Sequence, residues 1–444
     1  MPSPVPGSPP ASVRSRAAFA LVHCLVATLA LLSPVTVRAQ APESELPPEI
    51  GAFEGAIPAP VPGALLPDVP PAAYAATRVS APGFTLKPGL VLLADYTLFS
   101  QDSASRAQVG EQSDQGQLRA ARMLLRGTIG TGYVVRYLVA GEYKGFDTAY
   151  DRDWDMTDVS LTFPLRGPST TLTVGKTKQA FAYEMVGDAA NLAFQERVLS
   201  PFFVSRSVGA RLMHVTDDRL STVSFGVYND GWAGSSAKGP NDGTDVTLRV
   251  TRALWLEDGG RRLMHVGGSV RSAGADGGTL RYRGRPESNV ADFYVDTGTF
   301  AADRALHLGV EALWQHGPWS VIGEWVHAKV DAPRSGDPSF SGGYVGVSWV
   351  VTGQNRPYDT TVGYARRVPP GGPNGALELV ARASRVDLED GAVQGGRFVK
   401  SYLGANWWAT QRLKFGAGWG RTWLDDAGTR GITDALLMRA QWVY

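Results

Sequence analysis

The sequence predicts an all-β fold, a transmembrane antiparallel β-barrel of about 16 strands. From Gly89 onward, short segments alternate apolar and polar residues and are separated by Gly, Asp and Ser. The mean hydropathy is −0.12, and no apolar run reaches the ~18 residues of a helical span. A barrel strand contains no such run, because its apolar and polar residues alternate and their hydropathies cancel on average. The chain also ends on an alternating strand with aromatic residues at its close, Trp442-Val-Tyr444, as expected at a membrane interface.

The first residues have the order of a secretory signal peptide. Arg14 and Arg16 precede the apolar run 17–32, and Val37-Arg38-Ala39 supplies a small-residue cleavage site. The alternative is a membrane anchor, but this run is shorter than the ~20 residues that a spanning helix needs. We therefore expect residues 1–39 to be a signal peptide that is cleaved after Ala39.

The next segment is rich in proline and alanine. Residues 42–88 hold eleven prolines and almost no periodicity, which is typical of an extended or disordered linker. The predicted organisation is a signal peptide over 1–39, a periplasmic linker over 40–83 and a barrel over 84–444. Cys24 is the one cysteine and lies in the signal peptide, so the mature chain uses no disulfide.

Charge is nearly balanced. Without residues 1–39 the chain has 40 basic and 42 acidic side chains, which does not favour a nucleic-acid partner. A local excess exists in residues 197–285, with thirteen Lys and Arg against eight Asp and Glu. The sequence predicts no cofactor.

Sixteen segments have strand character, an even number as expected for a bacterial barrel. They are 88–100, 118–130, 133–144, 156–165, 169–178, 204–216, 220–230, 243–256, 260–272, 304–316, 318–330, 339–353, 375–388, 399–409, 411–423 and 434–444. A barrel of sixteen strands leaves an aqueous lumen.

The alternation predicts which face is lumenal. In 118–130, Met123 and Leu125 share one face, whereas Arg122 and Arg126 share the other. An Arg on the lipid face at mid-membrane height costs about 2–4 kcal/mol. The charged face should therefore line the lumen, where Arg122, Arg126 and Arg136 would form a ladder on neighbouring strands.

Connections fall into two groups. Short ones such as Gly317-Pro318 and Thr410 suit periplasmic turns, and long ones suit outer loops. The long group comprises 100–116, 230–243, 273–303 and 352–374.

Two clusters have alternative interpretations. Asp151, Asp153, Asp155 and Asp158 are either a solvated turn or an oxygen-rich Ca²⁺ site, although the EF-hand Gly and terminal Glu are missing. Nine tryptophans favour an interfacial girdle over a sugar-stacking path: Trp314, Trp319, Trp325, Trp349, Trp407, Trp408, Trp419, Trp423 and Trp442.

An outer-membrane hydrolase is the competing class. It needs a nucleophile, a base and an orienting group. His214, His265, His307, His316 and His327 are scattered over different segments, and the chain has no Gly-x-Ser-x-Gly elbow, His-Glu-x-x-His or P-loop. The pattern favours a channel over an enzyme.

Several ordered motifs resemble the phosphate-selective porin O and P family. They are Val174-Gly-Lys-Thr-Lys-Gln-Ala-Phe181, Ala193-Phe-Gln-Glu-Arg197, Phe203-Val-Ser-Arg-Ser-Val-Gly209, Phe340-Ser-Gly-Gly-Tyr344, Thr352-Gly-Gln-Asn-Arg-Pro-Tyr358, Gly375-Ala-Leu-Glu-Leu-Val-Ala-Arg382 with Val386-Asp-Leu388, Gly395-Gly396 and Gly404-Ala-Asn-Trp-Trp408. The resemblance covers about residues 84–444. It implies a homotrimeric, sixteen-stranded outer-membrane barrel with a loop folded into the pore and an anion-binding constriction that passes phosphate or polyphosphate. The chain departs from the family where Ser205-Arg206 stands in place of a Gly-Arg pair.

Candidate residues for the anion path combine lumenal parity with a position near the inward loop. Lys176 and Lys178 flank its start, and Arg197 ends its Gln-Glu-Arg motif, where Glu196 could instead hold Arg197 as architecture. Arg206 and Arg211 have opposite parity, so one alternation cannot place both inside unless a bulge intervenes. The full set is Lys176, Lys178, Arg197, Arg122, Arg126, Arg136, Arg206 and Arg211.

The predicted function is an anion-selective channel in the bacterial outer membrane, with phosphate or another inorganic anion as cargo. The alternative is a general or other-anion porin of the same fold. The expected partners are outer-membrane lipid, two further copies in a homotrimer, and the barrel-assembly machinery, which would read the C-terminal strand.

Overall fold

The computed structural model describes residues 79–444, apart from 145–152, 168, 230–242, 276 and 427. The signal peptide and most of the linker lie outside the described residues and stay predictions. The last residues of the linker differ from the expectation, because Val79–Ala81 form β1 and pair antiparallel with the next strand.

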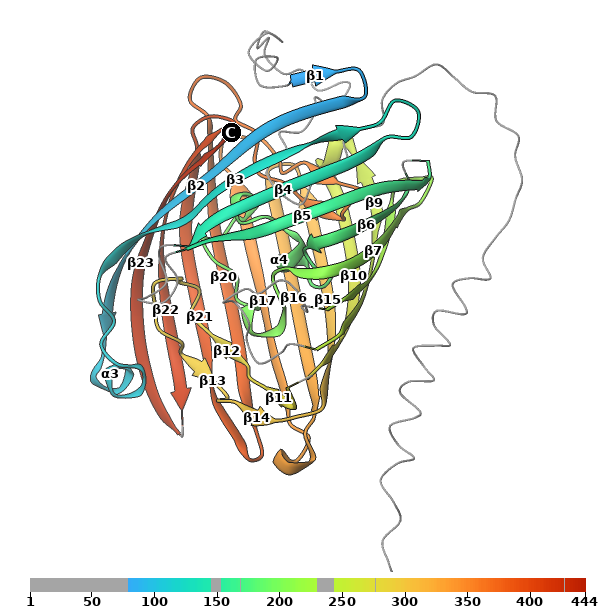
Figure 1. Cartoon of the computed structure of the whole chain (residues 1–444). Coiled ribbons are helices and arrows are strands. Elements are labelled where there is room, and N and C mark those ends of the chain that lie inside the picture. The colour runs from blue at the N-terminus through green and yellow to red at the C-terminus, as the bar shows by residue number, and fades with distance from the viewer. Residues whose placement is uncertain (1–78, 145–152, 168, 230–242, 276, 427) are drawn as a thin grey trace, which may run out of the picture. The chain divides into compact units, whose positions relative to one another are not determined.

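Sixteen long strands follow, each antiparallel to the next (Figure 1). They are β2 (Phe84–Gln101), β3 (Gln115–Ile129), β4 (Val135–Lys144), β5 (Asp153–Arg166), β6 (Thr170–Thr177), β7 (Ser207–Val215), β8 (Ser221–Tyr228), β9 (Asp245–Glu257), β10 (Arg262–Gly274), β15 (Arg304–His316), β16 (Trp319–Asp331), β17 (Ser339–Val350), β20 (Ala376–Asp390), β21 (Val393–Trp408), β22 (Leu413–Asp426) and β23 (Thr429–Val443). Each matches one of the sixteen predicted segments.

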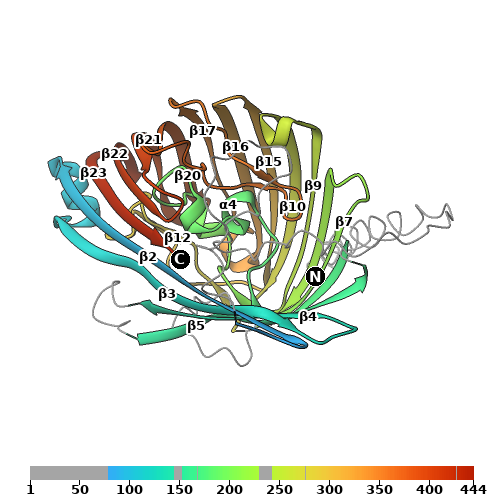
Figure 2. The same ribbon diagram turned by 90° about the horizontal axis from the view of Figure 1, so that it is seen from above.

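The sheet closes on itself. β2 pairs with β23 from Val91↔Val443 to Gln101↔Thr433, and the view from above shows the strands surrounding an interior (Figure 2). Closure leaves neither of these strands with an unpaired edge along this register. The predicted transmembrane barrel is confirmed.

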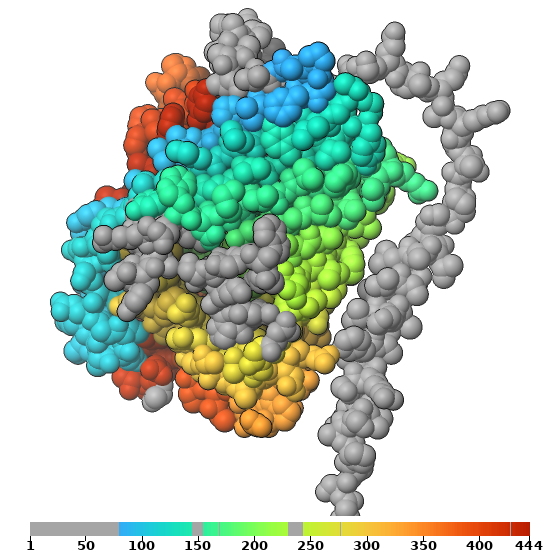
Figure 3. Space-filling view, viewed as in Figure 1, coloured from blue at the N-terminus to red at the C-terminus, as the bar shows by residue number. Residues whose placement is uncertain are grey.

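Alternation sets the two faces as predicted. On β3, Arg122 and Leu124 are buried inside, whereas Met123 is 58% exposed and Leu125 is 45% exposed on the outer face. The strands from β2 to β7 form one continuous outer surface, blue to green in Figure 3. Apolar residues thus cover the wall, and charges are kept in the lumen.

The tryptophans mostly follow the girdle interpretation. Six are exposed large hydrophobics of the outer face: Trp314, Trp319, Trp325, Trp407, Trp419 and Trp442. Trp408 is an exception, because its neighbour Trp407 faces outward and strand alternation turns Trp408 into the lumen. There its Nε1 donates to Glu378 at 3.0 Å.

The connections distinguish the two ends of the barrel. We call the end where β2 begins and β23 finishes the terminal end, and the opposite end the loop end. Short turns such as 317–318 and 409–412 lie at the terminal end, as predicted, which is typical of the periplasmic side. The prediction for 352–374 was wrong: residues 351–375 join β17 to β20 at the terminal end, because the twelfth strand runs toward that end. The length of this connection alone did not indicate the end of the barrel at which it lies.

Helices are few. α3 (Ser103–Val109) sits at the loop end, where Asp102 accepts the N–H of Ser105 at 2.7 Å as its N-cap. Among the described residues, no helix is long and apolar enough to cross a membrane.

Candidate functional site: the lumen and its inward-folded segments

The connection from β6 to β7 folds into the barrel. We call residues 178–206 the constriction loop. It contains α4 (Tyr183–Val186) and the short 3₁₀ turns η2 (Ala189–Asn191) and η3 (Ser200–Phe202), and α4 lies inside the ring of strands in Figure 2. Phe181, Val198 and Leu199 have no exposed surface. The inward loop expected from the family resemblance is present.

Cations on the barrel wall hold this loop by its backbone. A buried carbonyl is costly unless it accepts a hydrogen bond. Five cations supply one: four lie on barrel strands, and Arg356 lies on the inward-folded residues 351–375. The pairs are Arg356 to Asn191 O at 2.8 Å, Lys414 to Leu192 O at 3.2 Å, Arg439 to Gln195 O at 2.7 Å, Arg382 to Glu196 O at 2.8 Å and Arg271 to Phe202 O at 3.2 Å. Much lumenal positive charge is therefore structural.

Carboxylates hold the loop's N–H groups. Glu324 on β16 accepts from the backbone N of Tyr183 at 2.5 Å and of Glu184 at 3.0 Å. The Glu184 carboxylate in turn accepts from Val198 and Leu199 N–H and from Arg382 Nη1 at 3.1 Å. Burial raises the pKa of Glu184 to about 7, although Arg382 opposes this shift.

Lys178 and Arg197 turn toward the loop's own backbone. Lys178 Nζ and Arg197 Nη2 both donate to Gly187 O, at 3.1 and 2.7 Å, and Arg197 Nε donates to Glu184 O at 2.6 Å. Burial lowers the pKa of Lys178 to about 7, against the attraction of Asp188. Both candidates thus have an architectural role in this geometry.

Glu196 does not hold Arg197 by any bond that the structure describes. It pairs instead with Arg119 Nε at 2.7 Å and Arg439 Nη2 at 2.6 Å. Burial opposes ionisation, but these two guanidinium groups lower the pKa of Glu196 to about 2. No sequence pattern identifies Arg119 as a partner of Glu196, because the two residues lie 77 positions apart.

Three candidates form ion pairs with acids. Arg122 pairs with Glu142 and lies 3.9 Å from Asp188 Oδ1. Lys176 Nζ lies 3.6 Å from Asp155, and Arg206 Nε lies 2.8 Å from Asp158. Arg206 lies just before β7, so the alternation of that strand does not determine the direction of its side chain. The parity conflict between Arg206 and Arg211 therefore disappears.

The carboxylate cluster does not form a metal centre in the described part of the chain. Asp151 lies outside the described residues. Asp155 and Asp158 each face a cation, as above. Among described residues, no group of three or more His, Cys, Asp and Glu is arranged to hold a metal.

The remaining candidates lie on a less covered part of the wall. Arg126 on β3 faces Leu138, and Arg136 on β4 faces Thr128, so both belong to one lumenal patch. These side chains are half-buried. Arg136 Nη2 has no hydrogen-bond partner within the described residues. Arg211 is buried, and its Nη1 approaches Lys178 O at 3.4 Å.

Residues 351–375 also enter the lumen, from the terminal end, and were missed as a site. We call them the terminal segment; it contains the small strands β18 (Tyr358–Asp359) and β19 (Tyr364–Ala365). Arg356, Arg366 and Arg367 are all buried. Burial lowers the pKa of Arg367 to about 10, with Asp188 opposing this shift, and its Nη2 has no hydrogen-bond partner among the described atoms.

A third segment descends from the loop end. Residues 275–303 carry the paired strands β11 (Thr279–Leu280) with β14 (Phe300–Ala301) and β12 (Arg283–Gly284) with β13 (Val295–Asp296). Its Glu287 binds Arg382 and lies 4.0 Å from Lys400 Nζ. This segment therefore neutralises further cations on β20 and β21.

The segments fill the lumen unevenly. Lumenal side chains on β20 to β23 are deeply covered, with Glu378 at 0% and Arg439 at 4% exposure. On β3 and β4, Arg122 and Glu142 are buried as well, whereas Arg126 and Arg136 keep partial exposure. Of these lumenal cations, Arg126 and Arg136 are therefore more accessible than Arg439.

A closed sixteen-stranded barrel with polar side chains inside, an apolar outer face and inward-folded loops defines a bacterial outer-membrane porin. The chain belongs to the phosphate-selective porin O and P family, which matches residues 91–444. It is also 26% identical over 345 residues to an uncharacterised protein of Caulobacter vibrioides, covering 72% of this chain and 69% of that one.

Solved structures share the fold. OmpT of Vibrio cholerae, expressed in the outer membrane, has a TM-score of 0.51 at 10% identity and matches over 83% of this chain and all of that one. An anion-selective porin from Comamonas acidovorans has a TM-score of 0.51 at 13% identity over 81% of this chain and all of that one. Family and fold point to a channel rather than an enzyme.

Proposed function

We propose that this porin conducts anions and that phosphate or polyphosphate is its cargo. The observation that carries the proposal is the cationic patch of Arg126 and Arg136 on the accessible side of the lumen, together with buried Arg367 on the terminal segment. Arg136 and Arg367 each keep an Nη2 without a hydrogen-bond partner among the described residues. A guanidinium in this state has donor capacity for an oxyanion.

The arrangement suits transport better than tight binding. A pore must bind its ion well enough to admit it and weakly enough to release it, which favours several staged charges. Arg presents a planar fork that matches oxyanions. Lys178 and Arg197 contribute mainly positive potential, since their donors are used on loop carbonyls.

The remaining predictions belong to the same proposal. Residues 1–39 direct export, the linker 40–83 lies in the periplasm, and the barrel assembles as a homotrimer surrounded by outer-membrane lipid. The family supports the trimer, and the alternating C-terminal strand with Trp442 and Tyr444 supports recognition by the barrel-assembly machinery.

Planar-bilayer recording tests the function. The reversal potential under asymmetric KCl should indicate anion preference, and millimolar phosphate added to both sides should reduce the chloride current. Cation preference would overturn anion selectivity. Anion preference without phosphate block would support the alternative, which is a general or other-anion porin of the same fold.

A further inference from the structure

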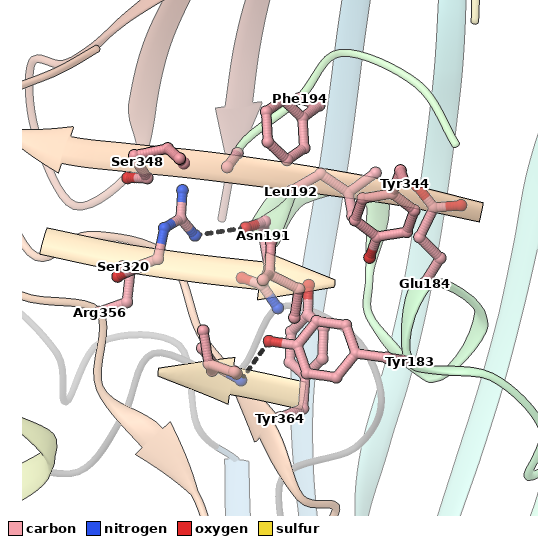
Figure 4. Close-up of a pocket in the computed structure, with 15 residues that line it drawn as sticks. Tyr183, Glu184, Asn191, Leu192, Phe194, Ser320, Tyr344, Ser348, Arg356 and Tyr364 are labelled. Atoms are coloured by element: carbon pink, nitrogen blue, oxygen red, sulfur yellow. Dashed lines mark hydrogen bonds between the residues drawn. The ribbon is translucent and has the colours of Figure 1, made fainter. Parts of the chain in front are cut away.

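The terminal segment and the constriction loop meet inside the lumen, although they enter from opposite ends. The backbone N of Ala365 donates to Tyr183 Oη at 3.0 Å, and the rings of Tyr183 and Tyr364 are 4.7 Å apart (Figure 4). A cavity of about 50 Å³ lies at this junction, lined by both segments and by β15 to β17. The contact between the two segments is therefore direct.

Gly187 of the constriction loop packs onto the same ring. A Cβ at this position would overlap the Tyr364 ring atoms. The backbone of Gly187 has φ −66° and ψ 145°, which any residue can adopt. Packing against Tyr364, and not backbone conformation, thus requires a glycine here.

Arg356 bonds to both segments with one nitrogen. Its Nη1 donates to Asn191 O of the constriction loop at 2.8 Å (Figure 4). The same atom donates to Arg366 O of its own segment at 3.0 Å. Its Nε and Nη2 each donate to the Glu378 carboxylate on β20 at 2.8 Å. Such a bidentate pair fixes the guanidinium plane.

The opposite side of the terminal segment is fixed to another part of the wall. Arg249 on β9 donates to Val362 O at 2.7 Å and Gly363 O at 2.9 Å. His265 on β10 bonds the Tyr358 hydroxyl at 2.7 Å. Thr222 on β8 donates to Thr360 O at 2.8 Å. The segment is consequently anchored to β8, β9, β10 and β20.

We propose that the terminal segment positions the constriction loop, with Tyr364 and Arg356 as positioning residues, so that conductance at the constriction is controlled from the terminal end of the barrel. The loop rests on this support at residues 183, 187 and 191. The inference rests on the proposed function only in that the barrel conducts ions; it does not depend on which ion passes.

The test compares Tyr364→Ala with Tyr364→Phe in single-channel recordings of the full-length protein. Phe keeps the ring against Tyr183 and Gly187, whereas Ala removes it. We expect a several-fold rise in open-channel current noise and partial closures for Tyr364→Ala, and wild-type traces for Tyr364→Phe. Heat-modifiable mobility on SDS gels checks that each barrel is folded. Tyr364→Ala channels with the current noise of the wild type and no partial closures would overturn the proposal.

Gly187→Ala disturbs the same contact from the loop side and keeps the test decisive if Tyr364→Ala folds poorly. Where both variants fold, they form a double-mutant cycle. Gly187→Ala should raise the current noise when Tyr364 is present and add nothing further in the Tyr364→Ala background, because neighbouring sites are non-additive. Equal added noise in both backgrounds would overturn the contact. A cation-selective wild type would refute the proposed function but leave this comparison intact.

Discussion

Arg439 on β23 and Asp95 on β2 form a bidentate ion pair across the seam where the barrel closes. Arg439 Nε and Nη2 each lie 2.7 Å from an Asp95 oxygen. The same guanidinium reaches Glu196 of the constriction loop at 2.6 Å. Barrel closure and loop position therefore share one buried side chain.

Replacing Arg439 with Gln should lower the free energy of unfolding by about 3–5 kcal/mol, because it removes the cation that the buried carboxylates of Asp95 and Glu196 share. Denaturant unfolding in detergent micelles measures this. Arg262→Gln is the control, because Arg262 and its partner Glu257 are 56% and 49% exposed, and an exposed pair contributes at most about 1 kcal/mol. Equal losses for the two variants would contradict the assignment.

Arg136→Gln and Arg367→Gln should each shift the reversal potential toward cations and weaken phosphate block. Each side chain keeps a guanidinium donor without a hydrogen-bond partner among the described residues, so we expect each to add positive potential and an unused donor to the anion path. The control is Arg397→Gln, whose side chain is 44% exposed and pairs with Asp425 at 3.0 Å. If Arg397→Gln changes block as much as the lumenal variants, the assigned path is wrong.

Anion preference should fall as the pH rises from about 6 to about 8. Burial holds the pKa of Lys178 at about 7, so its positive charge is lost across this interval. Glu184, whose pKa burial raises to about 7, gains negative charge over the same range. Reversal potentials at the two pH values measure the trend, and Lys178→Gln isolates the lysine. An anion preference that increases with pH would refute this prediction.

The Lys178 shift also has a defined effect on stability. The folded pKa lies below the unfolded value, so the unfolded chain binds more protons between about pH 7 and about 10.5, and this group's contribution to stability rises with pH in that window. The pH dependence of the denaturation midpoint should differ in this sense between wild type and Lys178→Gln.

Deleting Trp442–Tyr444 should reduce insertion into the outer membrane more than it reduces thermal stability. Tyr444 closes the seam through two backbone hydrogen bonds with Leu90, at 2.8 and 3.0 Å. Trp407→Ala removes another exposed outer tryptophan and should insert normally. The measurement is the folded fraction in isolated outer membranes. Full insertion of the truncated chain would disprove a role of this ending in assembly.

The strands and their faces follow from local sequence. Alternation around Arg122 and Arg126 predicted both the β3 strand and its lumenal side, because a one-residue error would place charges in lipid. The same rule failed for Arg206, since it lies outside a strand. Connection length misplaced 351–375, although the order of the strands would have assigned it to the terminal end.

The candidate site was less accessible to sequence. Positive charge near the inward loop was predicted, but the use of that charge depends on contacts between distant residues. Arg197 binds carbonyls of its own loop, and Glu196 binds Arg119 and Arg439. No local pattern distinguishes a cation that binds a carbonyl from one that meets an ion.

The wall cations reach the constriction loop at its backbone oxygens, as at Leu192, Gln195 and Glu196. Every amino acid carries that oxygen. Side chains of the loop can therefore be exchanged while the anchors persist, so the barrel can be retuned for a different cargo without being redesigned. Lumenal specificity and loop placement are, in this architecture, separate variables for protein engineering.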